Sequence, residues 1–300
     1  MMTAKSQQPL RGKIAYDEPM SKHTTWRVGG LADCYYQPAD IDDLAILLSQ
    51  LPPDEPITWI GLGSNLLVRD GGIRGTVIAT SGMLNGLQRL HGNRVRAESG
   101  VSCAKVARFC AREGLTGAEF LAGIPGTMGG ALAMNAGAFG GETWEIVSAV
   151  ETLHRNGQRH ERLPDEYEVG YRSVQGPANE WFVAAELELK PGDTSAAQGR
   201  IKELLAKRSA TQPTQLPNAG SVFRNPPGDH SARLIEASGL KGLCIGGACV
   251  SEKHANFIVN KGGASAADIE ALIKQVAHEV ELKQGVRLET EVRMVGEPKV

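Results

Sequence analysis

Two glycine-rich tracts, at residues 61–72 and 123–142, contain residue types that could do chemistry. Successive backbone N–H groups in such loops can hold a phosphate or diphosphate, and glycine permits the close approach that this requires. Neither tract is a P-loop, and Leu66 stands where the dinucleotide fingerprint needs its third glycine. For the first tract, a tight strand-to-helix turn explains the pattern equally well. The second tract is costly to order, which favours a cofactor cradle over a close-packed structural loop.

Positive charge is concentrated in residues 200–245, where seven Lys or Arg side chains outnumber three acids. A solvated helix face accounts for most of them. Arg224 differs because it shares a short polar stretch with Ser221 and Asn225, bounded by glycine and proline. Such a stretch suits the recognition of an anion by a loop.

Arg172 and Glu291 are further candidates, and each has an ordinary alternative. Arg172 follows a tyrosine in EYEVGYRS, where a surface ion pair would explain it. Glu291 alternates with apolar residues between Glu289 and Arg293, as on the solvated face of a strand. Residue types and spacing alone therefore assign neither of them a catalytic role.

Helical and strand patterns alternate along the chain, which predicts a mixed protein of several lobes. Asp40, Ser102, Ser195 and Ser265 are expected to begin helices, and Ser265 forms a capping-box pattern with Asp268. Strands are expected at 57–63, 181–189 and 286–296, with a hairpin around the Asn-Gly pair at 156–157. A composition shift at 191–199 predicts a lobe boundary near residue 200.

Composition excludes several classes of protein. A formal net charge of −2 excludes a globally basic nucleic-acid-binding surface. The five cysteines are odd in number and scattered, so we expect reduced thiols in a cytoplasmic protein, with no disulfide framework and no metal site. The first 20 residues lack a secretory signal, and the longest apolar stretch, 121–134, is too short to insert into a membrane.

Read in order, the motifs resemble those of the UDP-N-acetylenolpyruvoylglucosamine reductases, a family of FAD enzymes of bacterial peptidoglycan precursor synthesis. The matching stretches are TTWRVGG (24–30), GLGSNLLVRDGG (61–72), GLTGAEFLAGIPGTMGGALAMNAGAFGGE (114–142), YRS (171–173), NAGSVFRNP (218–226), GLKGLCIGGACVSEKHANFIVN (239–260) and LETEVRMVG (288–296). Seven residues separate Ser173 from Trp181, so the chain resembles the shorter subtype that lacks an inserted tyrosine loop.

The resemblance implies an α+β protein with three lobes. Residues 1–82 with a closing strand at 286–300 form the first lobe of an FAD-binding fold of the vanillyl-alcohol-oxidase type. Residues 83–200 form its second lobe. Residues 201–285 form a C-terminal α/β substrate-binding lobe.

The reaction implied is reduction of the enolpyruvyl ether of UDP-N-acetylglucosamine to UDP-N-acetylmuramate, with NADPH as reductant and FAD as the intermediate hydride carrier. The family's catalytic residues match Arg172, Ser221 and Glu291. Ser221 would donate a proton to the α-carbon, while Arg172 and Glu291 would hold the carboxylate and stabilise the enolic form. A carboxyl beside an enolate is useful only when protonated, so we expect a raised pKa for Glu291.

Binding residues also follow from the resemblance. Flavin contacts are expected at Gly61, Gly63, Ser64, Asn65, Leu66, Ile124, Pro125, Gly126, Thr127, Gly129, Asn135 and Gly137. UDP-sugar contacts are expected at Arg224, Asn225, Arg208 and His254, although a buried structural role would also explain His254. The alternatives are a related flavin oxidase and a non-catalytic binder of sugar nucleotides, and the oligomeric state is left open.

Overall fold

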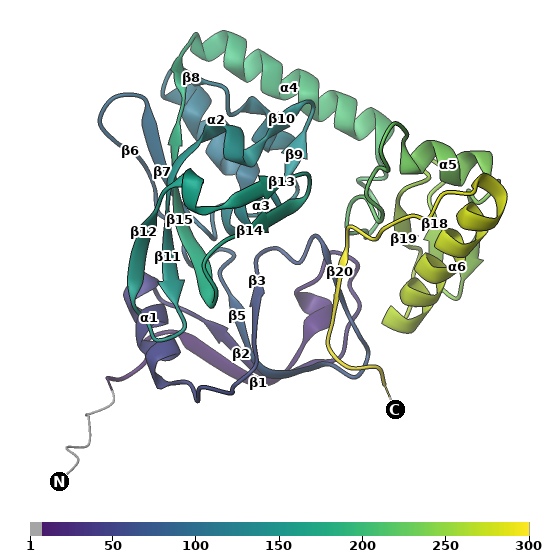
Figure 1. The fold of residues 1–300 in the computed structure, drawn as a ribbon, viewed down its shortest axis with the longest axis horizontal. Coiled ribbons are helices and arrows are strands. Elements are labelled where there is room, and N and C mark those ends of the chain that lie inside the picture. The colour runs from purple at the N-terminus through teal and green to yellow at the C-terminus, as the bar shows by residue number, and fades with distance from the viewer. Residues whose placement is uncertain (1–7, 300) are drawn as a thin grey trace. The chain divides into compact units, whose positions relative to one another are not determined.

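The computed structural model describes residues 8–299 and contains both helices and strands (Figure 1). Its contacts divide the chain into two compact units. Unit 1 holds the described residues up to Ala15, then Tyr35–Gly61 and Thr76–Ile201. Unit 2 holds Tyr16–Cys34, Leu62–Gly75 and the residues from Lys202 onward. The boundary predicted near residue 200 and the division after Ile201 both fall within one helix, α4 (Thr194–Thr211). The three-lobe division stays a prediction.

A four-stranded sheet has the order β1-β2-β5-β3, with strands β1 (Lys13–Pro19), β2 (Leu31–Gln37), β3 (Ile57–Ile60) and β5 (Ile73–Ala79). Helix α1 (Ile41–Gln50) begins as predicted at Asp40, whose carboxylate accepts a hydrogen bond from the Asp43 backbone N–H. That bond satisfies one of the helix's otherwise unpaired N–H groups.

Unit 1 contains a five-stranded antiparallel sheet in the order β12-β11-β15-β7-β6. Its strands are β6 (Leu87–Arg89), β7 (Arg94–Glu98), β11 (Val147–His154), β12 (Arg159–Arg162) and β15 (Glu180–Glu188). The predicted Asn-Gly hairpin joins β11 to β12, with Gly157 at a φ of +84°. Helices α2 (Cys103–Arg112) and α3 (Met128–Met134) also belong to this unit, and α3 contacts both β7 and β15.

Three two-stranded ladders complete unit 1. They are β8 (Leu115–Thr116) with β16 (Lys190–Pro191), β9 (Gly137–Ala138) with β10 (Gly141–Glu142), and β13 (Glu168–Gly170) with β14 (Ser173–Gln175). Unit 1 also contains the short 3₁₀ helices η2 (Glu119–Gly123), η3 (Thr143–Ile146) and η4 (Pro164–Glu166). The turn of the β13–β14 hairpin contains Arg172, one of the expected catalytic residues.

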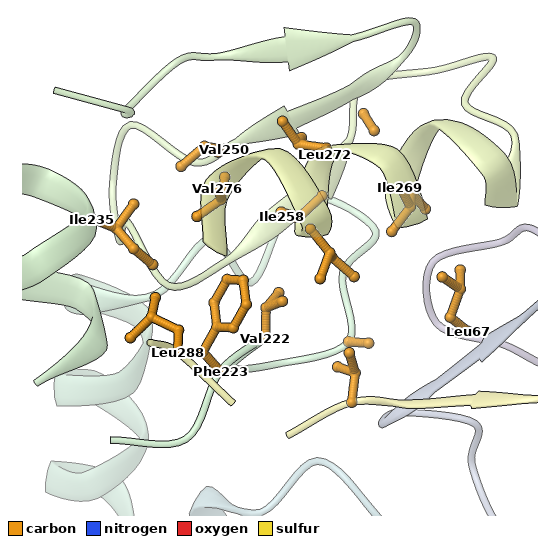
Figure 2. Close-up of a cluster of buried hydrophobic side chains, with 14 of the residues drawn as sticks. Leu67, Val222, Phe223, Ile235, Val250, Ile258, Ile269, Leu272, Val276 and Leu288 are labelled. Atoms are coloured by element: carbon orange, nitrogen blue, oxygen red, sulfur yellow. The ribbon is translucent and has the colours of Figure 1, made fainter. Parts of the chain in front are cut away.

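Unit 2 is built around a hydrophobic core that Figure 2 shows in close-up. Its elements are η1 (Met20–Lys22), β4 (Leu66–Val68), α5 (Ser231–Ala237), β17 (Cys244–Ile245), β18 (Ala248–Val250), β19 (Ile258–Asn260), α6 (Ala266–Gln284) and β20 (Arg293–Val295). Helix α6 has the predicted capping box at Ser265 and ends at Gly285 in the left-handed conformation. It packs Ile269, Leu272 and Val276 into the core.

The last strand is shorter than predicted. Only β20 is a strand, pairing in parallel with β4, so the expectation of a strand over 286–296 is wrong for 286–292. Leu288 and Val292 are both buried in the core of unit 2. The backbone around them forms hydrogen bonds with the segment near Val222 instead. The Glu291 N–H donates to the Val222 carbonyl at 2.8 Å. The period-2 pattern therefore marked the burial of Leu288 and Val292 correctly without a regular ladder, but Thr290, on the same face of the pattern, is exposed.

One expectation about the cysteines is also wrong. Cys244 and Cys249 are partners across the β17–β18 hairpin and form a disulfide. Their spacing does not match a CxxC motif. The two thiols come together because Cys244 and Cys249 lie opposite each other in the hairpin. Cys34, Cys103 and Cys110 are free, and burial raises the pKa of Cys103 and Cys110 to about 12.

Candidate active site

The expected catalytic residues are distributed over the two units. Arg172 belongs to unit 1, whereas Ser221 and Glu291 belong to unit 2. Among residues 8–299, no group of three or more His, Cys, Asp or Glu side chains could hold a metal ion. No helix in the same range has the length and apolarity that a membrane crossing requires.

Arg172 lies in the two-residue turn between β13 and β14, where Gly170 pairs with Ser173. Its φ of +54° is a left-handed conformation that side-chain-bearing residues rarely adopt. The guanidinium donates to the backbone carbonyls of Asn135, at 3.3 Å, and Gly137, at 3.1 Å. The structure therefore brings Arg172 against the second glycine-rich tract.

Two buried hydroxyls, one within the second glycine-rich tract and one packed against it, have no hydrogen-bond partner among the described residues. They are the Oγ1 of Thr127 and the Oγ of Ser99, whose residues are 2% and 1% exposed. Both lie beside glycines. A Cβ on Gly61 would lie 2.4 Å from the Thr127 hydroxyl, and one on Gly129 would lie 2.8 Å from the Ser99 Cβ. Buried hydroxyls normally find a partner, so this arrangement suits a bound ligand with polar atoms.

The remaining residues of the first tract belong to unit 2. Gly63 has a φ of +66°, and a Cβ there would lie 2.0 Å from the His23 carbonyl oxygen, so only glycine fits. The Asn65 side chain donates to the backbone carbonyl of Glu291 at 3.1 Å, and the backbone carbonyl of Asn65 accepts from the Arg293 N–H. A predicted flavin-binding residue and a predicted catalytic residue thus meet across 226 positions of sequence.

The segments of Ser221 and Glu291 are also adjacent. The N–H of Glu291 donates to the Val222 carbonyl, and that of Arg224 donates to the Glu289 carbonyl at 2.9 Å. Asn256 holds the segment that contains Ser221. Its side-chain oxygen accepts from the Phe223 N–H at 2.9 Å, and its side-chain nitrogen donates to the Phe223 carbonyl at 2.8 Å. Sequence reasoning did not identify Asn256 as functional, although it lies within the HAN of a matching motif.

The expected substrate-binding residues occupy different settings within unit 2. The side-chain oxygen of Asn225 accepts from the Ser231 N–H at the start of α5, which fixes the loop carrying Arg224. Arg208, on α4, donates to Gln212 at 3.1 Å, and burial lowers its pKa. Burial also lowers the pKa of His254, with a smaller effect from Lys241.

His254 packs edge-on against Phe257, with ring centroids 4.7 Å apart. Both of the roles that the sequence left open for this histidine, substrate contact and structural packing, are compatible with that setting.

Comparison with known proteins first defines a class. Residues 32–161 match the family described as FAD binding domain, and residues 212–295 match the C-terminal domain of UDP-N-acetylenolpyruvoylglucosamine reductase. The fold is therefore that of a flavoprotein, as predicted, and the buried hydroxyls beside Gly61 and Gly129 suit the polar atoms of a flavin nucleotide.

Relatives and a solved structure then narrow the class. The chain is 62% identical to the UDP-N-acetylenolpyruvoylglucosamine reductase of Methylococcus capsulatus over 294 residues, covering 98% of this chain and 97% of the relative. It is 60% identical to that of Alkalilimnicola ehrlichii, covering 99% of each. The crystal structure of the reductase from Thermus caldophilus is similar with a TM-score of 0.81 at 34% identity, covering 95% of this chain and 99% of that one. The chain belongs to the UDP-N-acetylenolpyruvoylglucosamine reductase family.

Proposed function

We propose that this protein catalyses the NADPH-dependent reduction of UDP-N-acetylglucosamine enolpyruvate to UDP-N-acetylmuramate, a step of peptidoglycan precursor synthesis. The near full-length similarity to reductases of that name, at 62% identity, carries the proposal. FAD, when bound, supplies transfer of a hydride from NADPH to the vinyl carbon of the substrate. The protein must bind both partners, stabilise negative charge on the substrate and supply one proton.

Arg172 is proposed to bind the substrate carboxylate. Its guanidinium offers planar donors that match the geometry of a carboxylate. The position of Arg172 at a hairpin turn, against the glycine-rich tract, supports this role because a fixed charge stabilises a developing anion better than a mobile one.

Ser221 is proposed to donate the proton, and Glu291 to share a proton with the enolic form. A serine hydroxyl is a weak acid, so it needs charged neighbours that stabilise its conjugate base. The hydrogen bonds that join the backbones near Ser221 and Glu291 support a shared site. Asn65 extends this site toward the first glycine-rich tract through its bond to the Glu291 carbonyl.

Several residues are proposed to hold FAD when it binds. In unit 1 they are Gly61, Ile124, Pro125, Gly126, Thr127, Gly129 and Gly137, and the unpartnered Thr127 hydroxyl is the observation that supports them best. In unit 2 they are Gly63, Ser64, Asn65 and Leu66. The UDP group is assigned to Arg224, Asn225, Arg208 and His254, and the cytoplasm, where NADPH is available, is the proposed location. The net charge of −2 supports a protein that binds no nucleic acid.

The test is an assay of purified, FAD-reconstituted protein. NADPH oxidation should depend on the enolpyruvyl sugar nucleotide, with one substrate reduced for each NADPH consumed. Colourless protein that binds the sugar nucleotide but no FAD would instead indicate a non-catalytic binder. Consumption of oxygen with an alcohol substrate, and none of the enolpyruvyl sugar, would indicate an oxidase.

A further inference from the structure

Asn135 ends helix α3 in an unusual way. It is the C-cap residue, with φ 43° and ψ 53°, and it is 2% exposed. Glycine is the residue usually found in this left-handed position, so the backbone conformation alone does not explain an asparagine here. The side chain should therefore have a function that glycine could not provide.

The Asn135 amide joins three separate segments of unit 1. Its Nδ2 donates to the Glu142 carboxylate at 2.8 Å, on β10, and to the Gly170 carbonyl at 3.2 Å, on β13. Its Oδ1 accepts from the Trp144 N–H at 3.1 Å. Both ends of the amide are thus bonded within the protein, which argues against the flavin contact expected from the sequence.

The bond to Gly170 holds the hairpin that carries Arg172. That hairpin has only three paired positions, and so short a ladder is marginally stable by itself. Near the start of the hairpin, Tyr167 packs against Trp144 in a tilted arrangement with ring centroids 4.8 Å apart. At the turn, Asn135 bonds to Gly170 through its side chain and accepts from Arg172 through its carbonyl. Asn135 thus contacts the hairpin at Gly170, just before the turn, and at Arg172, within the turn.

We propose that Asn135 is a positioning residue that fixes the Arg172 guanidinium for its contact with the substrate carboxylate. The inference rests on the proposed catalytic role of Arg172. Removing the Asn135 side chain leaves the charge of Arg172 in place but releases the turn that aims it. A misplaced catalytic group loses rate even when the displacement is about 1 Å.

The variant to make is Asn135→Gly, because glycine accepts the left-handed backbone and removes only the side chain. Reoxidation of the reduced flavin by the enolpyruvyl sugar nucleotide should slow on the order of 10²-fold. Reduction of the flavin by NADPH and the affinity for FAD should stay within about twofold of the wild type. Asn179→Gly is the matched control, since Asn179 is an exposed left-handed asparagine with a φ of 59° in the same unit, and it should change neither half-reaction.

A double-mutant cycle with Arg172→Ala separates positioning from a general structural effect. If Asn135 acts through Arg172, then Asn135→Gly should slow the Arg172→Ala enzyme less than about threefold. An equal slowing in both backgrounds, or a loss of FAD affinity in Asn135→Gly, would overturn the positioning role. If Arg172→Ala alone leaves reoxidation unchanged, the proposed role of Arg172 fails, and the inference about Asn135 fails with it.

A second pair of variants covers the case in which Asn135→Gly does not fold. Asn135→Asp sets two carboxylates against each other at the Glu142 contact, and adding Glu142→Gln restores a donor there. The double variant restores the contact at Glu142 but not the bond to the Gly170 carbonyl, because an aspartate has no donor for it. Its flavin reoxidation should therefore stay slow even though it folds, and reoxidation at the wild-type rate would contradict the proposal.

Discussion

At the scale of single residues, the site depends on polar side chains whose partners lie far away in sequence. Asn65 bonds to the Glu291 carbonyl, and Asn256 holds the backbone next to Ser221. Motif resemblance gave roles to Ser221 and Glu291, which stay predictions. It missed Asn256, because a buried amide that bonds to backbone leaves no periodic signal. Asn135 was expected on the flavin, whereas its amide is bonded within the protein.

Glu291 gives the prediction at this scale. Glu291→Gln should slow flavin reoxidation by the enolpyruvyl sugar about 10²- to 10³-fold, because the amide cannot share a proton with the enolic form. Reduction of the flavin by NADPH should be unaffected. The pH dependence of both half-reactions, measured by stopped-flow absorbance, provides the check, and near-wild-type turnover at every pH would remove Glu291 from the mechanism.

At the scale of elements, capping residues and turn residues predicted the structure best. Asp40 and Ser265 begin their helices with side-chain hydrogen bonds, and the Asn-Gly pair forms its hairpin. These signals involve residues that are close together in the sequence, so they can be recognised from the sequence alone. The last strand and the disulfide were predicted wrongly, since both depend on which distant segment each residue meets.

Two adjacent glycines of α3 give a matched prediction. Gly129→Ala should destabilise the protein, because the new Cβ would lie 2.8 Å from the Ser99 Cβ, and it should also weaken FAD binding. Gly130→Ala should stabilise it by up to about 1 kcal/mol, since the nearest atom is 3.9 Å away and alanine favours the helix. Thermal melts with and without FAD would test the pair, and equal effects of the two substitutions would contradict the packing argument.

Helix α6 gives a prediction of pH dependence. Hydrogen bonds from Arg69 and then Lys274 lower the pKa of Glu270 to about 2. The folded-state pKa thus lies below the unfolded value, so the ion pair stabilises the protein above about pH 4.5 and the stabilisation is lost as pH falls toward 2. Glu270→Gln should cost about 1–2 kcal/mol at pH 7, after allowance for solvent screening, and about a quarter of that at pH 2.5. Denaturant unfolding at several pH values would check this, and a cost that does not change with pH would refute the ion-pair account.

At the scale of the whole molecule, the residues proposed for catalysis and FAD binding are divided between the two units. Arg172 is carried by unit 1, and Ser221 and Glu291 by unit 2, with residues of the first glycine-rich tract in each. The family, the FAD-binding fold and the reaction were predicted correctly because seven ordered motifs span nearly the whole chain.

We propose that Ser221 protonates the enolpyruvyl group of the substrate. The most direct measurement compares the two half-reactions in Ser221→Ala and the wild type by single-turnover flavin absorbance. Flavin reduction by NADPH should keep its wild-type rate, while reoxidation by the enolpyruvyl sugar nucleotide should fall by about 10³-fold or more. Loss of both half-reactions together, or wild-type reoxidation, would contradict the account.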